Sequence, residues 1–310
     1  MVHHLSSLAL KRLLVSLLGA ALLAAAFSLA AVPPASAASH PLAGVSGCCA
    51  ALYVHYAAAG NTAYDYTDLD NSITNGNGST LVFVTPTWNP GGIWHGVFDT
   101  KNLGVWYNRF SQKWSIFNQD GSRMPTGAAF NVYALPAAFT DITARAHSGA
   151  FTHTATAANS VGDYTDISNV VTDNQPNEYL LVTANWSIND VYDNHPLGVW
   201  YHNGHWSIFH EDGTAIPAGA SYNVYASSPG YQGIQFLQQA TPANRTADYT
   251  LIDNPYLNTA PNALIFVTQE WRGVYNPVAV GVYYTPPTQR WTIFNENFTA
   301  IPTGALFTVL

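Results

Sequence analysis

Aromatic side chains recur beside acid or amide side chains at three places in this 310-residue chain. Each place has a tryptophan after an apolar run, then a loop with an aromatic residue next to Asp or Asn, then an aromatic residue in a Gly-Val-x-Tyr segment. Sugar rings stack on aromatic faces, and carboxylates and amides form directed hydrogen bonds with hydroxyl groups, so the pattern indicates sugar binding. The candidate ligand-binding residues are Trp88, Phe98, Asp99, Trp106, Trp186, Tyr192, Asp193, Trp200, Trp271, Tyr275, Asn276 and Tyr283.

The three loop tryptophans also have a structural interpretation. Trp88, Trp186 and Trp271 could close the end of a sheet as part of the core. The loops that follow them differ in length but keep their aromatic and acid or amide positions, as expected of binding loops on a rigid sheet. Exposure of the tryptophan rings would separate the two interpretations.

The recurring acids do not indicate catalysis. Asp120 and Asp212 correspond to Asn297 in the third segment, and a general acid or nucleophile needs an ionisable oxygen. Asp65, Asp163 and Asp248 precede Tyr-Thr, where an Asp side chain can accept backbone N–H groups and fix a turn. Short motifs for serine hydrolases, zinc proteases, phosphate loops and dinucleotide binding do not occur. No catalytic residue is therefore predicted.

An extracellular hydrolase is nevertheless the third functional hypothesis. Glu270 is the one carboxylate near a loop that is unique to its segment. Its partner would be Asp248 or Asp253, since glycosidases need paired acids.

The histidines do not predict a metal site. His202 and His205 could form a cross-strand zinc pair, but no third ligand follows at a typical spacing, and the interpretation as a solvated turn is favoured. His55 and His153 correspond to Gln238, and a position that accepts an amide favours hydrogen bonding over ligation. No metal and no cofactor are predicted.

All these residues belong to a segment that occurs three times. Asp-Tyr-Thr starts at residues 65, 163 and 248, and the tryptophans of the Thr-x-x-Trp motif are 98 and 85 residues apart. A period near 90 residues is too long for a short solenoid repeat and suits a small domain. The predicted boundaries are 1–37 for a signal peptide and 38–136, 137–227 and 228–310 for three β repeats.

Each repeat is expected to be a small antiparallel β-sandwich or barrel of about six strands, so the predicted fold class is all-β. The Asn203-Gly204 pair predicts a two-residue hairpin turn that places Tyr201 opposite Trp206 and Trp200 opposite Ser207. Three domains in tandem, each folding around its own core with secondary contacts between copies, are favoured. One closed pseudo-threefold assembly is the alternative.

The motifs Asp-Tyr-Thr, Val-Thr-x-x-Trp, Gly-Val-Trp-Tyr, Trp-Ser-Ile-Phe and Pro-x-Gly-Ala over residues 53–310 resemble a repeat of secreted bacterial proteins of unknown function. The resemblance implies export and β-structure, and it implies no activity.

The N-terminus predicts export. Lys11 and Arg12 precede an uncharged apolar run, and a small-x-small pattern ends at Ala37. The alternatives are an uncleaved membrane anchor and a lipoprotein with Cys48 as its anchor. Cys48 and Cys49, the two cysteines of the chain, form no disulfide framework, and the state of their thiols is left open.

The composition excludes several partners. Cleavage after Ala37 would leave 8 basic and 18 acidic residues, a net charge of about −10, which does not favour nucleic acid or anionic lipid. The leading prediction is a secreted, non-catalytic binding protein for a polysaccharide, cell-wall polymer or cell-surface glycan, with no membrane contact after cleavage. The runner-up is a structural or adhesive extracellular surface protein. The oligomeric state is not predicted.

Overall fold

The structure, a computed structural model, describes residues 50–93, 95–136, 148–230 and 234–310. All of them belong to one structural unit, Ala37–Leu310. The predicted signal peptide, Cys48 and Cys49 lie outside the described residues. No helix within the described ranges is long and apolar enough to cross a membrane.

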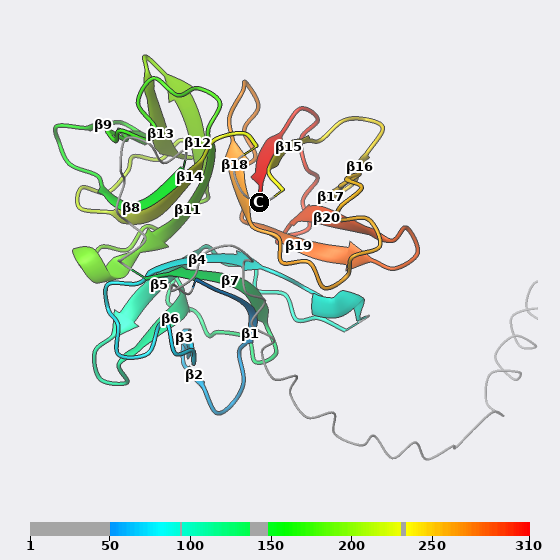
Figure 1. Cartoon of the computed structure of the whole chain (residues 1–310), viewed down its shortest axis with the longest axis horizontal. Helices are drawn as coiled ribbons and strands as arrows, with labels where there is room; N and C mark the ends of the chain where they lie inside the picture. Colours follow the sequence, from blue (N-terminus) through cyan, green and yellow to red (C-terminus); the bar gives the residue numbers. More distant parts are fainter. Residues whose placement is uncertain (1–49, 94, 137–147, 231–233) are drawn as a thin grey trace, which may run out of the picture. The chain divides into compact units, whose positions relative to one another are not determined.

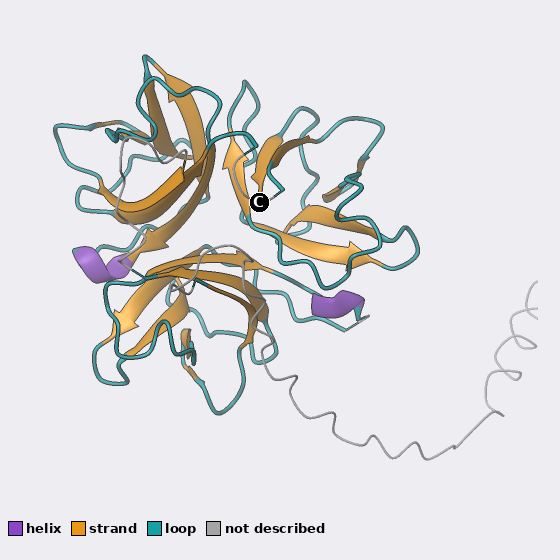
Figure 2. Cartoon of the chain, viewed as in Figure 1, coloured by secondary structure: helices purple, strands orange, loops and turns teal. Residues whose placement is uncertain are grey.

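Strands make up nearly all of the regular structure in the described residues, which confirms the all-β prediction (Figure 2). We call residues 38–136, 137–227 and 228–310 copies 1, 2 and 3. The described part of copy 1 contains β1 (Ala51–Tyr56), β2 (Thr62–Ala63), β3 (Tyr66–Asp68), β4 (Leu81–Pro86), the short 3₁₀ helix η1 (Pro90–Gly92), β5 (Leu103–Asn108), β6 (Lys113–Asn118) and β7 (Ala129–Leu135).

Copies 2 and 3 repeat this order of strands. Copy 2 contains β8 (Ser148–Thr154), β9 (Ser160–Val161), β10 (Tyr164–Asp166), β11 (Tyr179–Asn185), the 3₁₀ helix η3 (Trp186–Ile188), β12 (Leu197–His202), β13 (His205–His210) and β14 (Ser221–Ser227). Copy 3 contains β15 (Phe236–Gln239), β16 (Arg245–Thr246), β17 (Tyr249–Leu251), β18 (Val267–Glu270), β19 (Val280–Thr285), β20 (Arg290–Asn295) and β21 (Leu306–Val309).

Each copy is a small sandwich of two antiparallel sheets. In copy 1 the three-stranded sheet has the order β1-β7-β4, and the four-stranded sheet has the order β2-β3-β6-β5. Val82 and Val132 from the first sheet pack with Val105, Trp114 and Ile116 from the second, and all five side chains are buried. Copies 2 and 3 have equivalent cores.

The predicted hairpin register is confirmed. In copy 2, Tyr201 lies opposite Trp206 and Trp200 lies opposite Ser207. Copies 1 and 3 keep the register, with Trp106 opposite Ser115 and Tyr283 opposite Thr292. One face of every hairpin therefore enters the core of its own copy, and the other face carries one large aromatic residue beside one small hydroxyl residue.

Parallel pairing joins the copies to one another. The end of β11 pairs with β5, and the end of β18 pairs with β12, so the four-stranded sheet of one copy continues into the three-stranded sheet of the next. The third junction is a parallel bridge between Thr87 and Val282. The three copies, coloured from blue to red in Figure 1, thus form a closed ring.

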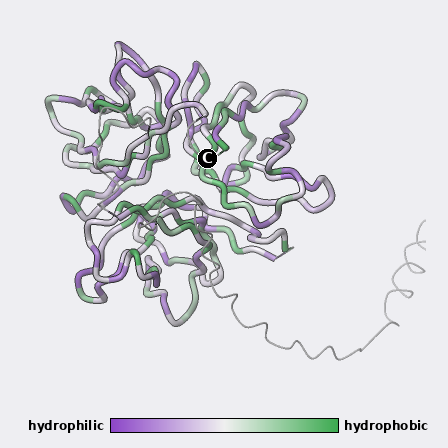
Figure 3. The backbone as a smooth tube through the Cα atoms, viewed as in Figure 1, coloured by the Kyte–Doolittle hydropathy of each residue, from purple (hydrophilic) through white to green (hydrophobic). Residues whose placement is uncertain are grey.

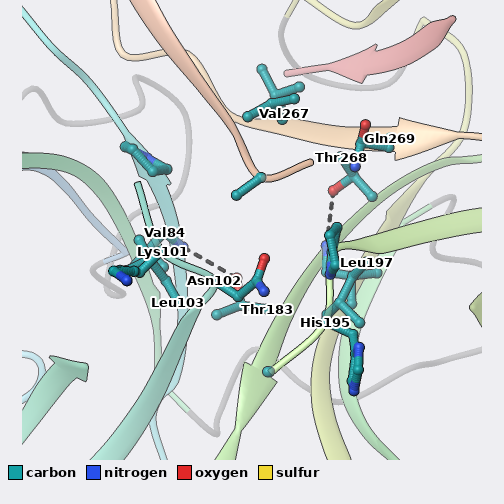
Figure 4. A pocket seen from close by; sticks show the side chains of 16 residues that line it. Val84, Lys101, Asn102, Leu103, Thr183, His195, Leu197, Val267, Thr268 and Gln269 are labelled. Atoms are coloured by element: carbon teal, nitrogen blue, oxygen red, sulfur yellow. Dashed lines mark hydrogen bonds between the residues drawn. The ribbon is translucent and has the colours of Figure 1, made fainter. Parts of the chain in front are cut away.

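A ring of hydrogen bonds reinforces this closure. At each junction the backbone N–H of a valine in a central strand donates to the threonine hydroxyl of the next copy. The pairs are Val84 with Thr183 (3.2 Å), Val182 with Thr268 (3.1 Å) and Val267 with Thr85 (3.1 Å). Figure 4 shows Thr183 and Thr268 on the wall of a central cavity of about 100 Å³ beside this ring.

A fourth core lies where the copies meet. Its buried members come from all three copies and include Phe83, Leu181 and Phe266. Tyr133 contacts Phe83 and Phe266, with ring centroids 6.0 Å apart in both cases. Leu310, at the C-terminus, packs against the same cluster. Figure 3 shows hydrophobic stretches along the inner strands and hydrophilic ones on many outer turns.

The prediction that contacts between copies are secondary is therefore corrected. Each copy has its own core, as expected, but the inner face of its central strand is buried against the other two copies. The closed pseudo-threefold assembly, which was the alternative, describes the structure. Sequence periodicity could not choose between the two because a central strand covered on both faces looks the same in either arrangement.

Phe83 provides a test of the shared core. Phe83→Ala should lower the free energy of unfolding by about 3–5 kcal/mol, since the ring is fully buried and its removal leaves a cavity. Calorimetry should show one transition at a lower temperature, because all three copies lose contacts. Phe110→Ala, at a fully exposed ring, is the control and should melt like the unaltered protein. Separate melting of the copies would contradict the shared core.

Candidate functional site

The predicted aromatic residues come together at the junctions between copies. At the junction of copies 1 and 2, Trp186 lies edge-on to Trp106, with centroids 5.9 Å apart and an interplanar angle of 87°. At the junction of copies 2 and 3, Trp271 lies edge-on to Trp200 at 5.5 Å and 89°. Each tryptophan follows a central strand that pairs with the neighbouring copy, so strand pairing sets the ring in place.

Two cavities open beside these ring pairs. The first has a volume of about 150 Å³ and the second about 160 Å³. They have the same lining, position for position: Asp65, Tyr66, Trp106, Phe117, Trp186 and Tyr192 in the first, and Asp163, Tyr164, Trp200, Phe209, Trp271 and Tyr275 in the second. Four residues of each cavity come from one copy, and the loop tryptophan and tyrosine come from the next.

The third junction contains an equivalent cluster that is arranged differently. Trp88 stacks on Phe98 at 5.3 Å and 20°, and it lies edge-on to Tyr283 at 6.1 Å. Phe298 adds a further ring, 4.7 Å from Phe98. Phe98 occupies the place of Tyr192 and Tyr275, which are 54% and 48% exposed, whereas Phe98 is half-buried.

The three copies place the chain in a family. A family model matches residues 45–134, 135–226 and 204–310, so it covers the three repeats. The chain belongs to the family described as domain of unknown function (DUF7452). No curated protein and no solved structure matches the chain. The family confirms tandem repeats of an uncharacterised domain.

The loop tryptophans are only partly buried in these DUF7452 copies. They therefore serve as junction wall and as cavity lining at the same time, which neither interpretation of Trp186 and Trp271 anticipated. The indole N–H groups of Trp88, Trp186 and Trp271 are buried and have no hydrogen-bond acceptor among the described residues. All three tryptophans lie edge-on to a ring of the neighbouring copy, a geometry compatible with weak N–H contacts to ring faces.

The acid and amide positions of the loops do not face the cavities. Asp99, Asp193 and Asn276 are each 3% exposed, and none of them lines either cavity. Asp193 accepts a hydrogen bond from the hydroxyl of Tyr222 at 2.6 Å, and Asn276 exchanges hydrogen bonds with Asn295. The structure therefore turns these three side chains into the interior, next to the aromatic residue of each loop, and their ligand binding stays a prediction.

The acids that line the two cavities are Asp65 and Asp163. The prediction assigned them a structural role, in which the side chain caps backbone N–H groups. Their backbone carbonyls do accept hydrogen bonds, from Asn118 and His210. Their carboxylates have no hydrogen-bond or ion-pair partner within the part of the chain that the structure describes. The recurrence of Asp-Tyr-Thr was the sequence signal for the aspartate position. Four aromatic lining residues were also missed in the sequence, and these are Tyr66, Tyr164, Phe117 and Phe209.

The histidine predictions have separate outcomes. His55 and His153 hydrogen-bond the hydroxyls of Thr67 and Thr165 at 2.8 Å, which confirms the hydrogen-bonding interpretation. Burial lowers the pKa of both imidazoles to about 4, so they are neutral at neutral pH. His202 contacts Asp166 and Ser207, whereas His205 contacts Asp173, so these two histidines bond to different acids.

One group of described residues could hold a metal ion. Asp193, His195 and His210 each offer a ligand atom, and these atoms lie within 4.8 Å of one another. The sequence prediction of no metal site overlooked this group, because its ligands come from a loop and from the end of β13, 15 to 17 residues apart.

The central cavity, which His195 helps to line, contains none of the predicted ligand-binding residues.

The hydrolase hypothesis gains no support from Glu270. Its carboxylate is 3% exposed and is held by Arg272 at 2.7 Å and by the hydroxyl of Thr308 at 2.9 Å. Asp253, one proposed partner, forms a surface ion pair with Arg290. Both groups are therefore occupied in structural contacts.

Two carboxyl groups lie close together at the third junction. At each of the other two junctions, the equivalent positions hold one carboxyl group and one amide. Gln119 accepts from the backbone N–H of Asp193 at 3.3 Å, and Glu211 accepts from that of Asn276 at 2.9 Å. The equivalent pair is Glu296 with Asp99, and both line one small enclosed space. Burial and the nearby Asp99 raise the pKa of Glu296 well above its usual value.

This pair predicts a pH-dependent stability. Burial raises the pKa of Asp99 to about 7 from 3.8; Asp120 acts in the same direction, and Asn118 and Lys101 act against it. The folded state then holds a proton that the unfolded state releases, so this group lowers stability progressively as the pH rises from about 4 to about 7. Asp99→Asn, which introduces the amide that copy 3 has at Asn276, should raise the melting temperature at pH 8 and leave it nearly unchanged at pH 4.

The control for this measurement is Asp253→Asn, at a surface ion pair. Its effect should be small at both pH values, since exposed ion pairs contribute about 0–1 kcal/mol. An Asp99→Asn protein that gains as much stability at pH 4 as at pH 8, or gains none at pH 8, would contradict the raised pKa.

Proposed function

We propose that the protein is a secreted, non-catalytic binding protein for a polysaccharide or cell-surface glycan. The observation that carries the proposal is the pair of equivalent cavities at the junctions of copies 1 and 2 and of copies 2 and 3. Each combines several aromatic rings with a carboxylate that has no partner among the described residues, the combination that suits a ligand with apolar faces and polar groups.

Two sites on one chain also suit a repetitive ligand. When one cavity holds a polymer, the second cavity meets the same polymer at a high effective concentration. Weak binding at each cavity is then sufficient for firm attachment to a polysaccharide. The sites lie on the closed ring of copies, so strand pairing fixes their relation to each other.

The runner-up is a structural or adhesive surface protein. It is favoured by the inward-turned indole N–H groups and by aromatic contacts that run across every junction. These contacts would strengthen the ring whether or not a ligand binds. The two exposed tyrosines separate the hypotheses, because they contribute to the cavities while leaving much of their surface in solvent.

The combined variant Tyr192→Ala and Tyr275→Ala tests the proposal. It removes one aromatic wall from each cavity, and loss of these ring contacts from both sites should weaken polysaccharide binding at least about tenfold. Binding is measured on a glycan array and by calorimetry with the polysaccharide that the array identifies. Each single variant should halve the number of bound oligosaccharides per chain, because it leaves one cavity intact.

Tyr256→Ala is the matched control, since Tyr256 is 72% exposed and lines neither cavity. It should bind as the unaltered protein does. The structural hypothesis gains if no polysaccharide binds, or if the double variant binds as tightly as the control while its melting temperature is unchanged.

A further inference from the structure

The two junction cavities share a geometry that specifies one kind of chemical group. In the cavity of copies 2 and 3, Tyr164 lies 5.7 Å from Trp200 at an angle of 82°. Trp200 is perpendicular to Trp271, and Trp271 lies 5.7 Å from Tyr275 at 45°. Rings at such angles line the same space from several directions. The cavity of copies 1 and 2 repeats this series of ring contacts, from Tyr66 to Tyr192.

The volume of each cavity suits a compact group. A cavity of about 150 Å³ accommodates a molecule of the size of benzene. The two junction cavities, of about 150 and 160 Å³, therefore have room for a substituent of that size. The remainder of a larger ligand, such as a sugar ring, would lie at the mouth beside the exposed faces of Tyr192 and Tyr275.

The charge of the cavities specifies the sign of that group. Asp65 and Asp163 line the cavities, and their half-exposed carboxylates have no hydrogen-bond or ion-pair partner among the described residues. No Lys, Arg or His is among the described residues that line either cavity, so a cation that enters the cavity would meet an opposite charge and no competing one. Other carboxylates have cations already: Asp120 pairs with Lys101, and Asp253 pairs with Arg290.

We propose that each of the two cavities binds a positively charged alkylammonium group, of the trimethylammonium type found in choline, carried by the ligand. Aromatic rings attract such cations through their faces, and sets of rings are the usual means of recognising quaternary ammonium groups. The carboxylate supplies the opposite charge. This inference rests on the proposed function, because it names the group by which a glycan or other polymer enters the sites.

The third junction explains why the number of sites is two. Phe298 stands where copies 1 and 2 have Gly121 and Gly213, and it keeps the positive φ of those glycines, at 62°. A bulky residue is rarely found in this conformation, which is strained without glycine. Its ring lies edge-on to Phe98 at 4.7 Å, and Phe98 is half-buried where Tyr192 and Tyr275 are exposed.

Choline and its uncharged isostere 3,3-dimethylbutan-1-ol provide the direct test. Titrations of the full chain, followed by calorimetry and by the NMR signals of the indole N–H groups, should show two choline sites per chain. The isostere has nearly the same shape but no charge, so it should bind at least about tenfold more weakly. Ethanolamine should also bind more weakly than choline, because its ammonium group is smaller and more strongly hydrated. Equal binding of choline and the isostere, or no binding of either, overturns the inference.

Variants locate the sites. Asp65→Asn and Asp163→Asn should each weaken choline binding at one site and leave the isostere unaffected. Asp248→Asn, at the equivalent position of the third junction, is the matched control and should change nothing. Phe298→Gly should raise the number of choline sites to three. Choline binding that survives both Asp65→Asn and Asp163→Asn places the ammonium group elsewhere and overturns the inference.

Two further measurements separate this inference from the proposed function and identify the molecule that carries the ammonium group. Polysaccharide binding that choline does not displace supports glycan binding and overturns the ammonium inference. Two choline sites in a protein that binds no polysaccharide support the ammonium inference and contradict the glycan proposal. Co-sedimentation with phosphatidylcholine vesicles, against vesicles of phosphatidylglycerol, would support the ammonium inference with a lipid headgroup as the carrier.

A second inference rests on the group of Asp193, His195 and His210 in copy 2. The side chains of Asp193 and His210 are 2% and 0% exposed, and Oδ1 of Asp193 lies 2.7 Å from Nε2 of His210. The other copies lack this set. Copy 1 has Lys101 and Asn118, and copy 3 has Val278 and Asn295, at the positions of the two histidines.

Polar contacts at Nδ1 hold both imidazoles in place. Nδ1 of His210 lies 2.9 Å from the carbonyl oxygen of Thr214 and 3.0 Å from its hydroxyl. Nδ1 of His195 lies 2.8 Å from the carboxylate of Asp212 and 2.9 Å from the hydroxyl of Thr214. Nε2 of each ring is therefore the nitrogen left to bind a metal ion. Nε2 of His210 already faces Oδ1 of Asp193, and neither atom has another hydrogen-bond partner among the described residues.

We infer that these three residues bind a divalent transition-metal ion, with zinc the best match. Two imidazoles and one carboxylate are typical zinc ligands, and the second nitrogen of a zinc-ligating histidine usually contacts a carboxylate or a backbone carbonyl, as Nδ1 of His195 and of His210 does. Nε2 of His210 and Oδ1 of Asp193, now 2.7 Å apart, have to separate slightly to admit the ion. The rings of His195 and His210 stack at 4.5 Å and 26°, so His195, which is 31% exposed, has to turn for its lone pair to reach the ion.

Metal-free full-length protein, prepared with a chelator, tests this site. Zinc titration by calorimetry should show a tight equivalent that raises the melting temperature, and cobalt should give the absorption spectrum of a four-coordinate site. His195→Val, which introduces the residue of copy 3 at a half-exposed position, should remove that equivalent and the melting shift. His205→Ala, outside the group, is the control and should retain both. A His195→Val protein that binds zinc as the unaltered protein does overturns the site, and His210→Asn provides a second variant.

Discussion

The assembly of the three copies depends on three backbone N–H groups in the central strands, those of Val84, Val182 and Val267. Val84 and Val182 are buried, and on this edge of their strands the copy itself supplies no ladder partner for the N–H. An unsatisfied buried N–H costs about 1–3 kcal/mol. The threonine hydroxyl of the next copy accepts the hydrogen bond instead, at all three junctions. Closure of the ring is thus the means by which three edge strands, which would otherwise attract other chains, become satisfied.

The candidate sites follow from the same closure. A tryptophan lies three residues after each of these threonines, where the strand has just paired with the aromatic strand of the neighbouring copy. No single copy contains a complete cavity. Four of the lining residues belong to one copy, and the loop tryptophan and tyrosine belong to the next. Binding and assembly therefore depend on the same contacts. The exposed tyrosines are the part of each site that assembly does not need.

Local features of the fold could be predicted from the sequence, and contacts between copies could not. The register of Trp200 with Ser207 follows from a two-residue turn within one hairpin. The approach of Trp186 to Trp106 depends on pairing across about 80 residues, which no short pattern encodes. The burial of the loop acids could not be predicted for a related reason. Asp193 follows Tyr192 directly, and sequence cannot tell which of two adjacent side chains turns inward when Tyr222 supplies a buried partner.

The differences between copies then acquire a physical explanation. Closure requires the threonine, the tryptophan and the apolar inner face, and these are present in all three copies. Positions outside that set are free to diverge on the same backbone. The turn residue is glycine in copies 1 and 2 and Phe298 in copy 3, all with positive φ, so the backbone conformation persists where the side chain changes. The buried polar position next to the loop is Asn118, His210 or Asn295, and only the histidine lies beside a second imidazole. Repetition of one scaffold thus gives three junctions with the same geometry and different chemistry.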